Sequence, residues 1–220
     1  DSEVTAGFMW QKTTRESKKY QLRGEILSFI PVEKNVEVML VTITNTGRMA
    51  QTVTPTAAIP LYGRSADNIR DHRHVTSLLH RIETTDTGVL VTPTLSFDER
   101  GHQVNHMTYY CVGWSGNGEK PVDFYPTAED FVGEGGNFER PYAIVKNAEG
   151  VKAGTRIEGL EAVGGLHFSE VTLEPEEECS YLIFTGITED IQEIRNLSKT
   201  YTTREMVLEE LEKTKAYWQE

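Results

Sequence analysis

Hydrophobic and polar residues alternate along most of the chain, and the hydrophobic positions are rich in β-branched and aromatic side chains. Such a pattern predicts β-strands that turn one face to a core. The clearest run is 36–45, where the odd-numbered positions carry polar Glu37 and then apolar Met39, Val41 and Ile43. Because Thr46 and Gly47 supply a turn, we expect this run to form a hairpin with a second strand over 51–58.

The same alternation recurs often enough to decide the fold class. It predicts nine strands, over residues 20–30, 36–45, 51–58, 75–83, 89–97, 107–114, 155–163, 166–173 and 180–188. No helical period separates these runs, which favours antiparallel sheets over a parallel arrangement. We therefore predict a mainly β protein, with one large antiparallel β-sandwich over residues 1–188.

The helical period begins only after Thr188. Asp190 can cap a short helix through Leu197, and Thr202 and Glu205 have the spacing of a capping box. A second, amphipathic helix of about 17 residues follows, with apolar residues at three- and four-residue steps. Its apolar stripe consists of Val207, Leu208, Leu211 and Trp218. We therefore expect at most two helices, both in a carboxy-terminal linker over residues 189–220.

Composition and charge narrow the class of partner. The 220 residues are 38% hydrophobic and 25% charged, which is typical of a soluble globular protein. A chain of this length buries roughly 70% of its unfolded surface, so its core needs neither a disulfide nor a metal. It has no apolar run of about 20 residues and no signal peptide at its amino terminus. The net charge of −12 repels phosphate backbones, so we expect neither nucleic acid nor a membrane as a partner.

The two cysteines, Cys111 and Cys179, each lie inside an apolar, β-like run. Small buried thiols often occupy such positions, and a disulfide between the two stays open at this stage. We expect a reducing, cytoplasmic setting. The chain begins without an initiator methionine and ends in a helical pattern, so we expect it to be an excised fragment.

One basic segment stands out in this acidic chain. Residues 64–81 hold four of the twelve arginines and three of the six histidines. Arginine forks bind phosphates, carboxylates and paired sugar hydroxyls, which makes the segment a candidate sugar-contact or interface site. The alternative is a structural network in which nearby acids pair with the arginines. The candidate residues are Arg64, Asp67, Asn68, Arg70, Asp71, Arg73 and His74.

Three histidines of this segment could serve as metal ligands: His72, His74 and His80. No other residues have the spacing of metal ligands, and histidines near strands are more often hydrogen-bonded structural residues. We therefore predict no metal.

Glycines and prolines interrupt the strand pattern between residues 110 and 149, and loops of this length are usually functional or bind another surface. Residues 133–136 read Gly-Glu-Gly-Gly, which invites comparison with a phosphate-binding loop. No parallel strand precedes them, no helix follows, and acidic residues surround them, so we interpret the segment as a turn-rich loop packed by Phe124, Phe131 and Phe138. Its candidate site residues are Phe131, Gly133, Glu134 and Gly135.

Several of these segments resemble the amino-terminal β-sandwich of the sugar phosphorylases of glycoside hydrolase family 94, formerly glycosyltransferase family 36. The family has a strand that ends in Thr-Asn-Thr, as residues 44–46 do, and residues 71–78 are similar to its Asp-x-His-Pro-Ala-Phe-Ser-Lys-Leu segment. Its loop of the form Phe-x-Thr-Asp-Arg-x-x-Phe-Leu-Gly-Arg-Gly-Arg matches at Phe124, Phe131, Gly133 and Gly135. The resemblance covers roughly residues 20–220.

This chain departs from the family pattern at the charges of that loop. Thr127 and Ala128 stand where Asp-Arg is usual, and Glu134 and Gly136 stand where arginines are usual. The Arg-Ser-Ala-Asp-Asn sequence at 64–68 and these departures more closely resemble the branch that acts on β-1,2-linked glucans.

The resemblance implies a sandwich of the supersandwich type, followed by linker helices and an (α/α)6 barrel that is absent from this chain. In the family the barrel carries the general acid and the phosphate site, and phosphate replaces water in an inverting displacement that yields a sugar 1-phosphate. No catalytic residue is therefore expected here, and no cofactor apart from inorganic phosphate as co-substrate. The implied partners are the barrel of the same or a neighbouring subunit, a β-glucan oligosaccharide and a second subunit in a homodimer.

Two other hypotheses stay open, a free-standing carbohydrate-binding module and a pure assembly domain. A binding module should expose aromatic side chains on one sheet face. The sequence does not predict such a face, because its three tryptophans, Trp10, Trp114 and Trp218, lie far apart in the chain.

Overall fold

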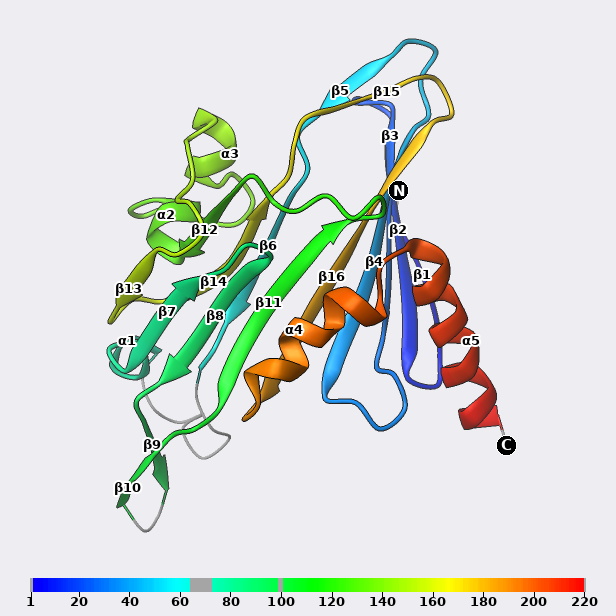
Figure 1. Ribbon diagram of the computed structural model, residues 1–220. Coiled ribbons are helices and arrows are strands. Elements are labelled where there is room, and N and C mark those ends of the chain that lie inside the picture. The colour runs from blue at the N-terminus through cyan, green and yellow to red at the C-terminus, as the bar shows by residue number, and fades with distance from the viewer. Residues whose placement is uncertain (1, 64–72, 99–100, 220) are drawn as a thin grey trace.

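The computed structural model describes residues 2–63, 73–98 and 101–219 (Figure 1). The chain is mainly β, with 47% strand and 19% helix. Its largest element is a nine-stranded antiparallel sheet. In spatial order the strands are β1 (Ser2–Gly7), β2 (Trp10–Ser17), β3 (Leu22–Phe29), β4 (Val36–Asn45), β16 (Glu178–Thr188), β11 (Thr108–Ser115), β8 (Gly88–Pro93), β7 (His80–Thr84) and β13 (Arg156–Glu158).

Smaller elements surround this sheet. A three-stranded antiparallel sheet has the order β12 (Asp123–Thr127), β14 (Ala162–His167) and β6 (Thr56–Leu61). Two ribbons pair β9 (Leu95–Asp98) with β10 (Gly101–Val104) and β5 (Gln51–Val53) with β15 (Val171–Leu173). The helices are α1 (Arg73–Ser77), α2 (Ala128–Val132), α3 (Tyr142–Lys146), α4 (Ile191–Thr200) and α5 (Arg204–Gln219).

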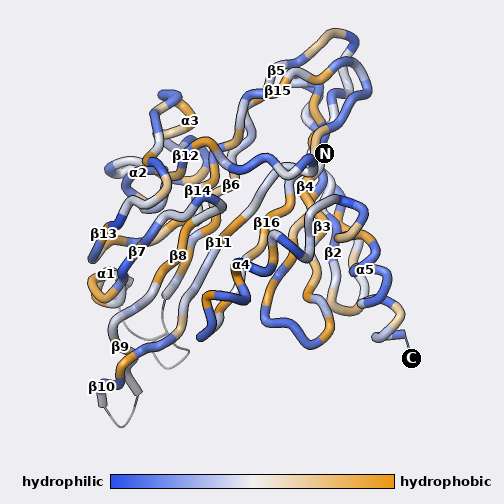
Figure 2. Tube along the Cα trace, in the orientation of Figure 1, coloured by the Kyte–Doolittle hydropathy of each residue, from blue (hydrophilic) through white to orange (hydrophobic). Residues whose placement is uncertain are grey.

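The central strands of the large sheet are buried on both faces. On β4, Val38 and Leu40 pack into the cluster that includes residues of α4 and α5, while Val41 faces the three-stranded sheet. On β8, Leu90 and Val91 divide between the same two clusters. A strand covered on both faces loses the polar half of its alternation, which explains the hydrophobic positions along β4, β8 and β16 in Figure 2. The predicted antiparallel sandwich is confirmed.

The two carboxy-terminal helices lie on the face opposite the three-stranded sheet (Figure 1). α4 contacts β16, and α5 contacts both β4 and β16. Asp190 caps α4 by accepting a hydrogen bond from the backbone N–H of Gln192 at 2.8 Å, as predicted. Before α5 it is Thr203, and not Thr202, whose hydroxyl accepts from the N–H of Met206, at 3.5 Å. The division at residue 188 between sandwich and linker stays a prediction.

Tyr201 joins the two helices and fixes them to the sheet. Its backbone carbonyl accepts a hydrogen bond from the indole nitrogen of Trp114 at 2.9 Å. Its ring is buried and lies 5.4 Å from the ring of Phe184, and its hydroxyl accepts from the ammonium of Lys34 at 2.6 Å. Helices α4 and α5 are therefore part of the hydrophobic core of the sandwich.

The prediction of at most two helices is wrong, because three short helices precede Thr188 in the described part of the chain. Residues 73–77, partly assigned to a strand over 75–83, form α1, and β7 begins only at His80. Val75, Leu78, Leu79 and Ile82 recur at the three- and four-residue steps of a helix, so the period was ambiguous there.

The segment 110–149 is also less irregular than predicted. It contains α2, α3 and the entirely buried strand β12, whose five residues are too short a run to reveal their period. α2 begins where the hydroxyl of Thr127 accepts from the N–H of Asp130 at 3.0 Å, a helix-start signal that is visible in the sequence.

The predicted hairpin of 36–45 with 51–58 does not form. β4 pairs with β3 on one side and β16 on the other, so neither edge is left for the strand that follows. The Asn45 amide donates to the carbonyls of Met49 at 2.8 Å and Leu173 at 2.9 Å, and its carbonyl oxygen accepts from the N–H of Gly47 at 2.8 Å. These contacts lead the chain out of the large sheet, and β5 pairs with β15 instead.

Candidate functional site

A pocket of about 300 Å³ brings the two segments chosen from the sequence together. Its floor is formed by β6 and β14, and its sides by α1, the start of β7, and the turn that follows α2. We name it the β6–α2 pocket. The described residues that line it are Pro60, Leu61, Tyr62, Thr76, Ser77, His80, Ala128, Val132, Gly136, Asn137, Phe138, Glu161, Ala162 and Val163.

The turn after α2 is shaped by glycines. Gly133 ends the helix at a φ of 77°, in the left-handed region that side chains rarely adopt. A Cβ on Gly136 would lie 1.8 Å from the carbonyl oxygen of Val132, so no larger residue fits there without movement. Phe131 is buried, and its ring lies 5.7 Å from the ring of Phe138, which reaches the pocket.

The four predicted loop residues therefore have different roles. Phe131 and Gly133 position the turn from beneath, whereas Glu134 and Gly135 are exposed on it and are not among the described residues that line the pocket. Of the three phenylalanines expected to pack the loop, Phe124 instead faces the core under the large sheet.

His80 lies on the wall of the pocket and is buried. Burial lowers the pKa of its imidazole, and the backbone carbonyl of Leu160 only partly opposes this effect. Nδ1 lies 3.1 Å from that carbonyl, and the backbone of Gly63 also acts against the effect of burial. Nε2 has no hydrogen-bond partner in the described part of the chain. The sequence suggested His80 only as a weak metal ligand.

Most of the predicted basic site lies outside the residues that the structure describes. Arg64, Asp67, Asn68, Arg70 and Asp71 fall there, as does His72.

Arg73 and His74 begin α1, and only their backbone is described, so the part that these residues play stays a prediction. Arg81, at the other end of the segment, pairs with Glu158 at 3.4 Å and donates to the carbonyl of His80 at 2.9 Å. These contacts are local and partly exposed, so they contribute little stability.

Sequence reasoning missed an acid and base pair on β12 and β14, in which Asp123 is buried and His167 is half-buried. The imidazole Nδ1 of His167 lies 2.6 Å from a carboxylate oxygen of Asp123, and the ammonium of Lys152 lies 3.9 Å from the other oxygen. Asp123 and His167 are directly opposite each other on β12 and β14. Neither residue lines one of the pockets formed by the described residues, and we interpret the pair as a contact that stabilises the pairing of β12 with β14.

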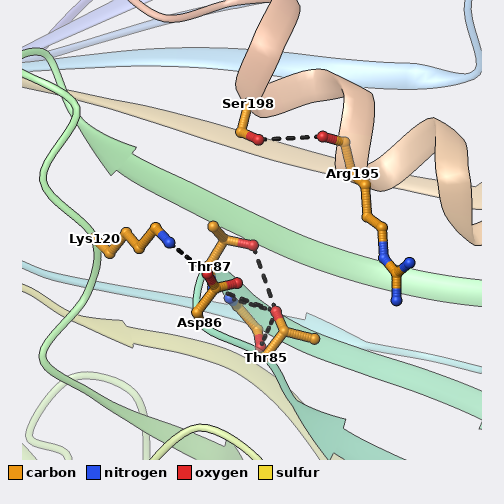
Figure 3. A network of polar contacts seen from close by, with 7 residues as sticks. Thr85, Asp86, Thr87, Lys120, Arg195 and Ser198 are labelled. Atoms are coloured by element: carbon orange, nitrogen blue, oxygen red, sulfur yellow. Dashed lines mark hydrogen bonds and ion pairs between the residues drawn. The ribbon is translucent and has the colours of Figure 1, made fainter.

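A second polar hollow, of about 390 Å³, lies between α4 and the β7–β8 turn (Figure 3). The hydroxyl of Thr85 accepts from the N–H groups of Thr87 and Gly88, and Lys120 pairs with Asp86. Figure 3 draws no contact between the guanidinium of Arg195 and this turn. The network closes a turn and brings no group into position for catalysis.

Neither a cluster of metal ligands nor a membrane-spanning helix occurs among the described residues. No three His, Cys, Asp or Glu side chains among them gather as a metal site. No helix among them has the length and apolar character that a membrane crossing requires. Cys111 and Cys179 are both free thiols, and burial raises the pKa of Cys111 to about 12, which keeps it unreactive.

A nine-stranded sheet that carries a smaller sheet on one face and two helices on the other defines a large β-sandwich of the supersandwich class. The family described as "Glycosyl hydrolase 94, supersandwich domain" matches residues 1–204, so the chain belongs to this family. The resemblance found in the sequence is confirmed at this level.

Other comparisons add less. No curated protein matches the chain. A solved structure of the polysaccharide lyase BACCELL_00875 is similar to it, at 12% identity and a TM-score of 0.44. That similarity covers 88% of this chain and 23% of the lyase, so this chain spans about a quarter of the lyase's length.

Proposed function

We propose that this chain is the non-catalytic amino-terminal domain of a cytoplasmic inverting glycoside phosphorylase, where it serves assembly and helps to shape the sugar cleft. The match of the family to residues 1–204 is the observation that carries the proposal. The fixed position of α4 and α5 on the sheet supports it, because helices held through Tyr201 would give a following barrel a defined starting point.

The reaction would take place in the absent barrel. A phosphate oxygen forms a bond to the anomeric carbon as the glycosidic C–O bond breaks, and a general acid of the barrel protonates the leaving oxygen. The domain described here would contribute the turn after α2 and the basic segment 64–81 to the rim of that barrel, in the same or a neighbouring subunit of a homodimer. The resemblance of residues 64–68 and of the loop to the branch that acts on β-1,2-linked glucans supports such a glucan as the substrate.

The alternative of a free-standing carbohydrate-binding module receives less support. In the described part of the chain, the well-exposed aromatic side chains lie in turns, connections and helices and do not form a row on one sheet face. They are Phe8, Tyr20, Tyr62, Phe138, Tyr142, Tyr217 and Trp218. A sheet-face platform for a polysaccharide is therefore not built from them.

The test is to express the full protein of the parent reading frame beside this 220-residue chain, and to supply each with phosphate and β-1,2-, β-1,3- or β-1,4-linked glucobiose. We expect glucose 1-phosphate from the full protein with the β-1,2-linked disaccharide, and none from this chain. A reading frame that ends near Glu220, or phosphorolysis by this chain alone, would overturn the proposal.

A further inference from the structure

We infer that the outer edge of β1 is a dimerisation surface, to which β1 of a second copy of this chain adds as the next antiparallel strand of the large sheet. Strand addition of this kind pairs the backbone groups that an edge strand leaves open. The inference goes beyond the proposed function, because it requires only residues of this chain and names an interface that the homodimer expected of the parent protein leaves unspecified.

β1 is an open edge of the large sheet. It is the outermost strand, and among the described strands only β2 pairs with it. All six residues of β1 are exposed, and α5 contacts chiefly β4 and β16. The pairing of β1 with β2 is regular from end to end, so no bulge bends the edge away. β1 contains no proline, lysine or arginine.

The opposite edge of the same sheet is protected. β13 has only three residues, and two of them, Arg156 and Glu158, are charged. Short edge strands and charged side chains are common defences against pairing with another chain. β1 has neither, apart from the single charge of Glu3. The two edges therefore differ in the way expected when only one of them pairs with another chain.

Backbone hydrogen bonds show which groups of β1 are directed outward. The N–H of Ile30 donates to the carbonyl of Met9 at 3.3 Å, so the odd-numbered residues of β2 exchange hydrogen bonds with β3. Such bonds alternate between the two neighbours of an antiparallel strand, so the even-numbered residues of β2 bond to the odd-numbered residues of β1. The backbone groups that point away from β2 are therefore those of Ser2, Val4 and Ala6.

These outward groups are self-complementary about Val4. When two copies of β1 run antiparallel with Val4 opposite its own copy, Ser2 lies opposite Ala6, and the backbone groups of all three pairs face each other. Only this two-fold register uses all three residues. It also places Glu3 opposite the uncharged Thr5, so no like charges are directly opposed. The strand therefore fits a second copy of itself.

Side chains on one face of the sheet support the same register. Val4, Thr13 and Ile26 lie opposite one another on β1, β2 and β3, and Val41 of β4 continues the row. Val4 is 64% exposed and Ile26 is 43% exposed. Placing Val4 against its copy buries part of this surface and joins the two rows. One pair of six-residue strands buries less than the ~1,200 Å² of a standard interface, so we expect a weak, reversible dimer.

The first experiment is sedimentation equilibrium of this 220-residue chain over a range of concentrations. We expect a monomer–dimer equilibrium with a dissociation constant of about 100 μM. Val4→Pro removes an outward N–H that β2 does not use, so it should weaken the dimer about tenfold or more and keep the melting temperature of the dilute chain. Val4→Thr is the matched control. It keeps the N–H and a β-branched side chain, so its dissociation constant should stay within about threefold of the parent value.

Disulfide trapping tests the register of the two strands. In Val4→Cys the new thiols lie on directly opposed residues, with Cα atoms about 5.5 Å apart, which a disulfide can span. In Glu3→Cys they lie on the diagonal, about 8 Å apart, which is too far. Under mild oxidation Val4→Cys should form a disulfide-linked dimer, and Glu3→Cys should form one only when it is mixed with Thr5→Cys. The unsubstituted chain, which has its own free thiols, is the blank.

A chain that stays monomeric at about 1 mM, a dimer that Val4→Pro leaves unchanged, or equal trapping of Val4→Cys and Glu3→Cys would each overturn the inference. So would the full protein of the parent reading frame if Val4→Cys were not trapped in it, because another segment would then cover β1. None of these measurements involves phosphorolysis, so their failure is distinguishable from failure of the proposed function.

Discussion

Tyr201 is the residue through which α4 and α5 are fixed to the large sheet, and its removal gives the most informative change in stability. Its ring is 2% exposed and packs on Phe184 in the cluster that joins α4, α5 and the large sheet. Its hydroxyl accepts from Lys34, and its carbonyl accepts from Trp114. The variants Tyr201→Ala and Tyr201→Phe separate the contribution of the ring from that of the hydroxyl.

The expected magnitudes differ for the two variants. Truncating a buried aromatic residue to alanine costs about 3–5 kcal/mol, because the transfer free energy is lost and a cavity remains. In a domain of this size that corresponds to a fall in melting temperature of about 6–20 °C. Tyr201→Phe keeps the ring and removes only the hydrogen bond from Lys34. Because Lys34 is partly exposed and also lies 3.8 Å from Glu210, we expect a cost of about 1 kcal/mol or less.

Far-ultraviolet circular dichroism during urea and thermal unfolding measures both effects. Tyr217→Ala is the control, since Tyr217 lies on α5 but is 56% exposed and should change stability by no more than about 0.5 kcal/mol. If Tyr201→Ala unfolds at the same urea concentration and temperature as Tyr217→Ala, the helices are not part of the core and the reasoning fails.

Three further predictions concern pH and close packing. Above pH 9 the Cys111 thiol ionises in the unfolded chain, but it stays protonated in the folded chain, where its pKa is about 12. The free energy of unfolding should therefore fall by up to about 1.4 kcal/mol per pH unit between these two pKa values. Cys111→Ala should remove that part of the pH dependence, as measured by urea unfolding at pH 9–11. The lowered pKa of His80 acts on the acid side, because the unfolded chain takes up a proton below about pH 6.5 and the fold does not. Stability should therefore fall as the pH drops from 7.5 to 5, and His80→Gln should show a shallower fall. Gly136→Ala should destabilise the chain by about 1–3 kcal/mol because its Cβ would collide with the Val132 carbonyl, measured by thermal unfolding.

Control variants and a contradicting outcome can be given for these three predictions. Cys179→Ala should change the alkaline slope less, since that thiol is only half buried. Gly24→Ala should cost little, because a Cβ there meets no atom within 4 Å. Equal alkaline slopes in Cys111→Ala and the parent, an unchanged acid slope in His80→Gln, or equal stability of the two glycine variants would contradict the respective prediction.

The sequence predicted the fold class because alternation and helical period are local properties. The runs at 36–45 and 180–188 became central strands, and the period after Thr188 became α4 and α5. Strand pairing is not local, and so the hairpin expected at Gly47 was wrong. Nothing near residues 46–50 shows that the preceding strand β3 and the distant strand β16 occupy both edges of β4.

The candidate site was predictable in part for the same reason. The composition of 64–81 and the glycines of 133–136 marked two segments, and the described parts of both line one pocket. The other contributions could not be found locally. Tyr62 has no distinguishing neighbours, and the pairing of Asp123 with His167 depends on the register of β12 and β14.

The stereochemistry of the reaction tests the central claim most directly. The full protein of the parent reading frame, given phosphate and the β-1,2-linked disaccharide of glucose, should release glucose 1-phosphate, and proton NMR of the fresh product reports its anomeric configuration. Inversion at the β-linked carbon predicts α-glucose 1-phosphate as the first product. Release of β-glucose 1-phosphate, or of free glucose alone without any sugar phosphate, would contradict the assignment of this domain to an inverting glycoside phosphorylase.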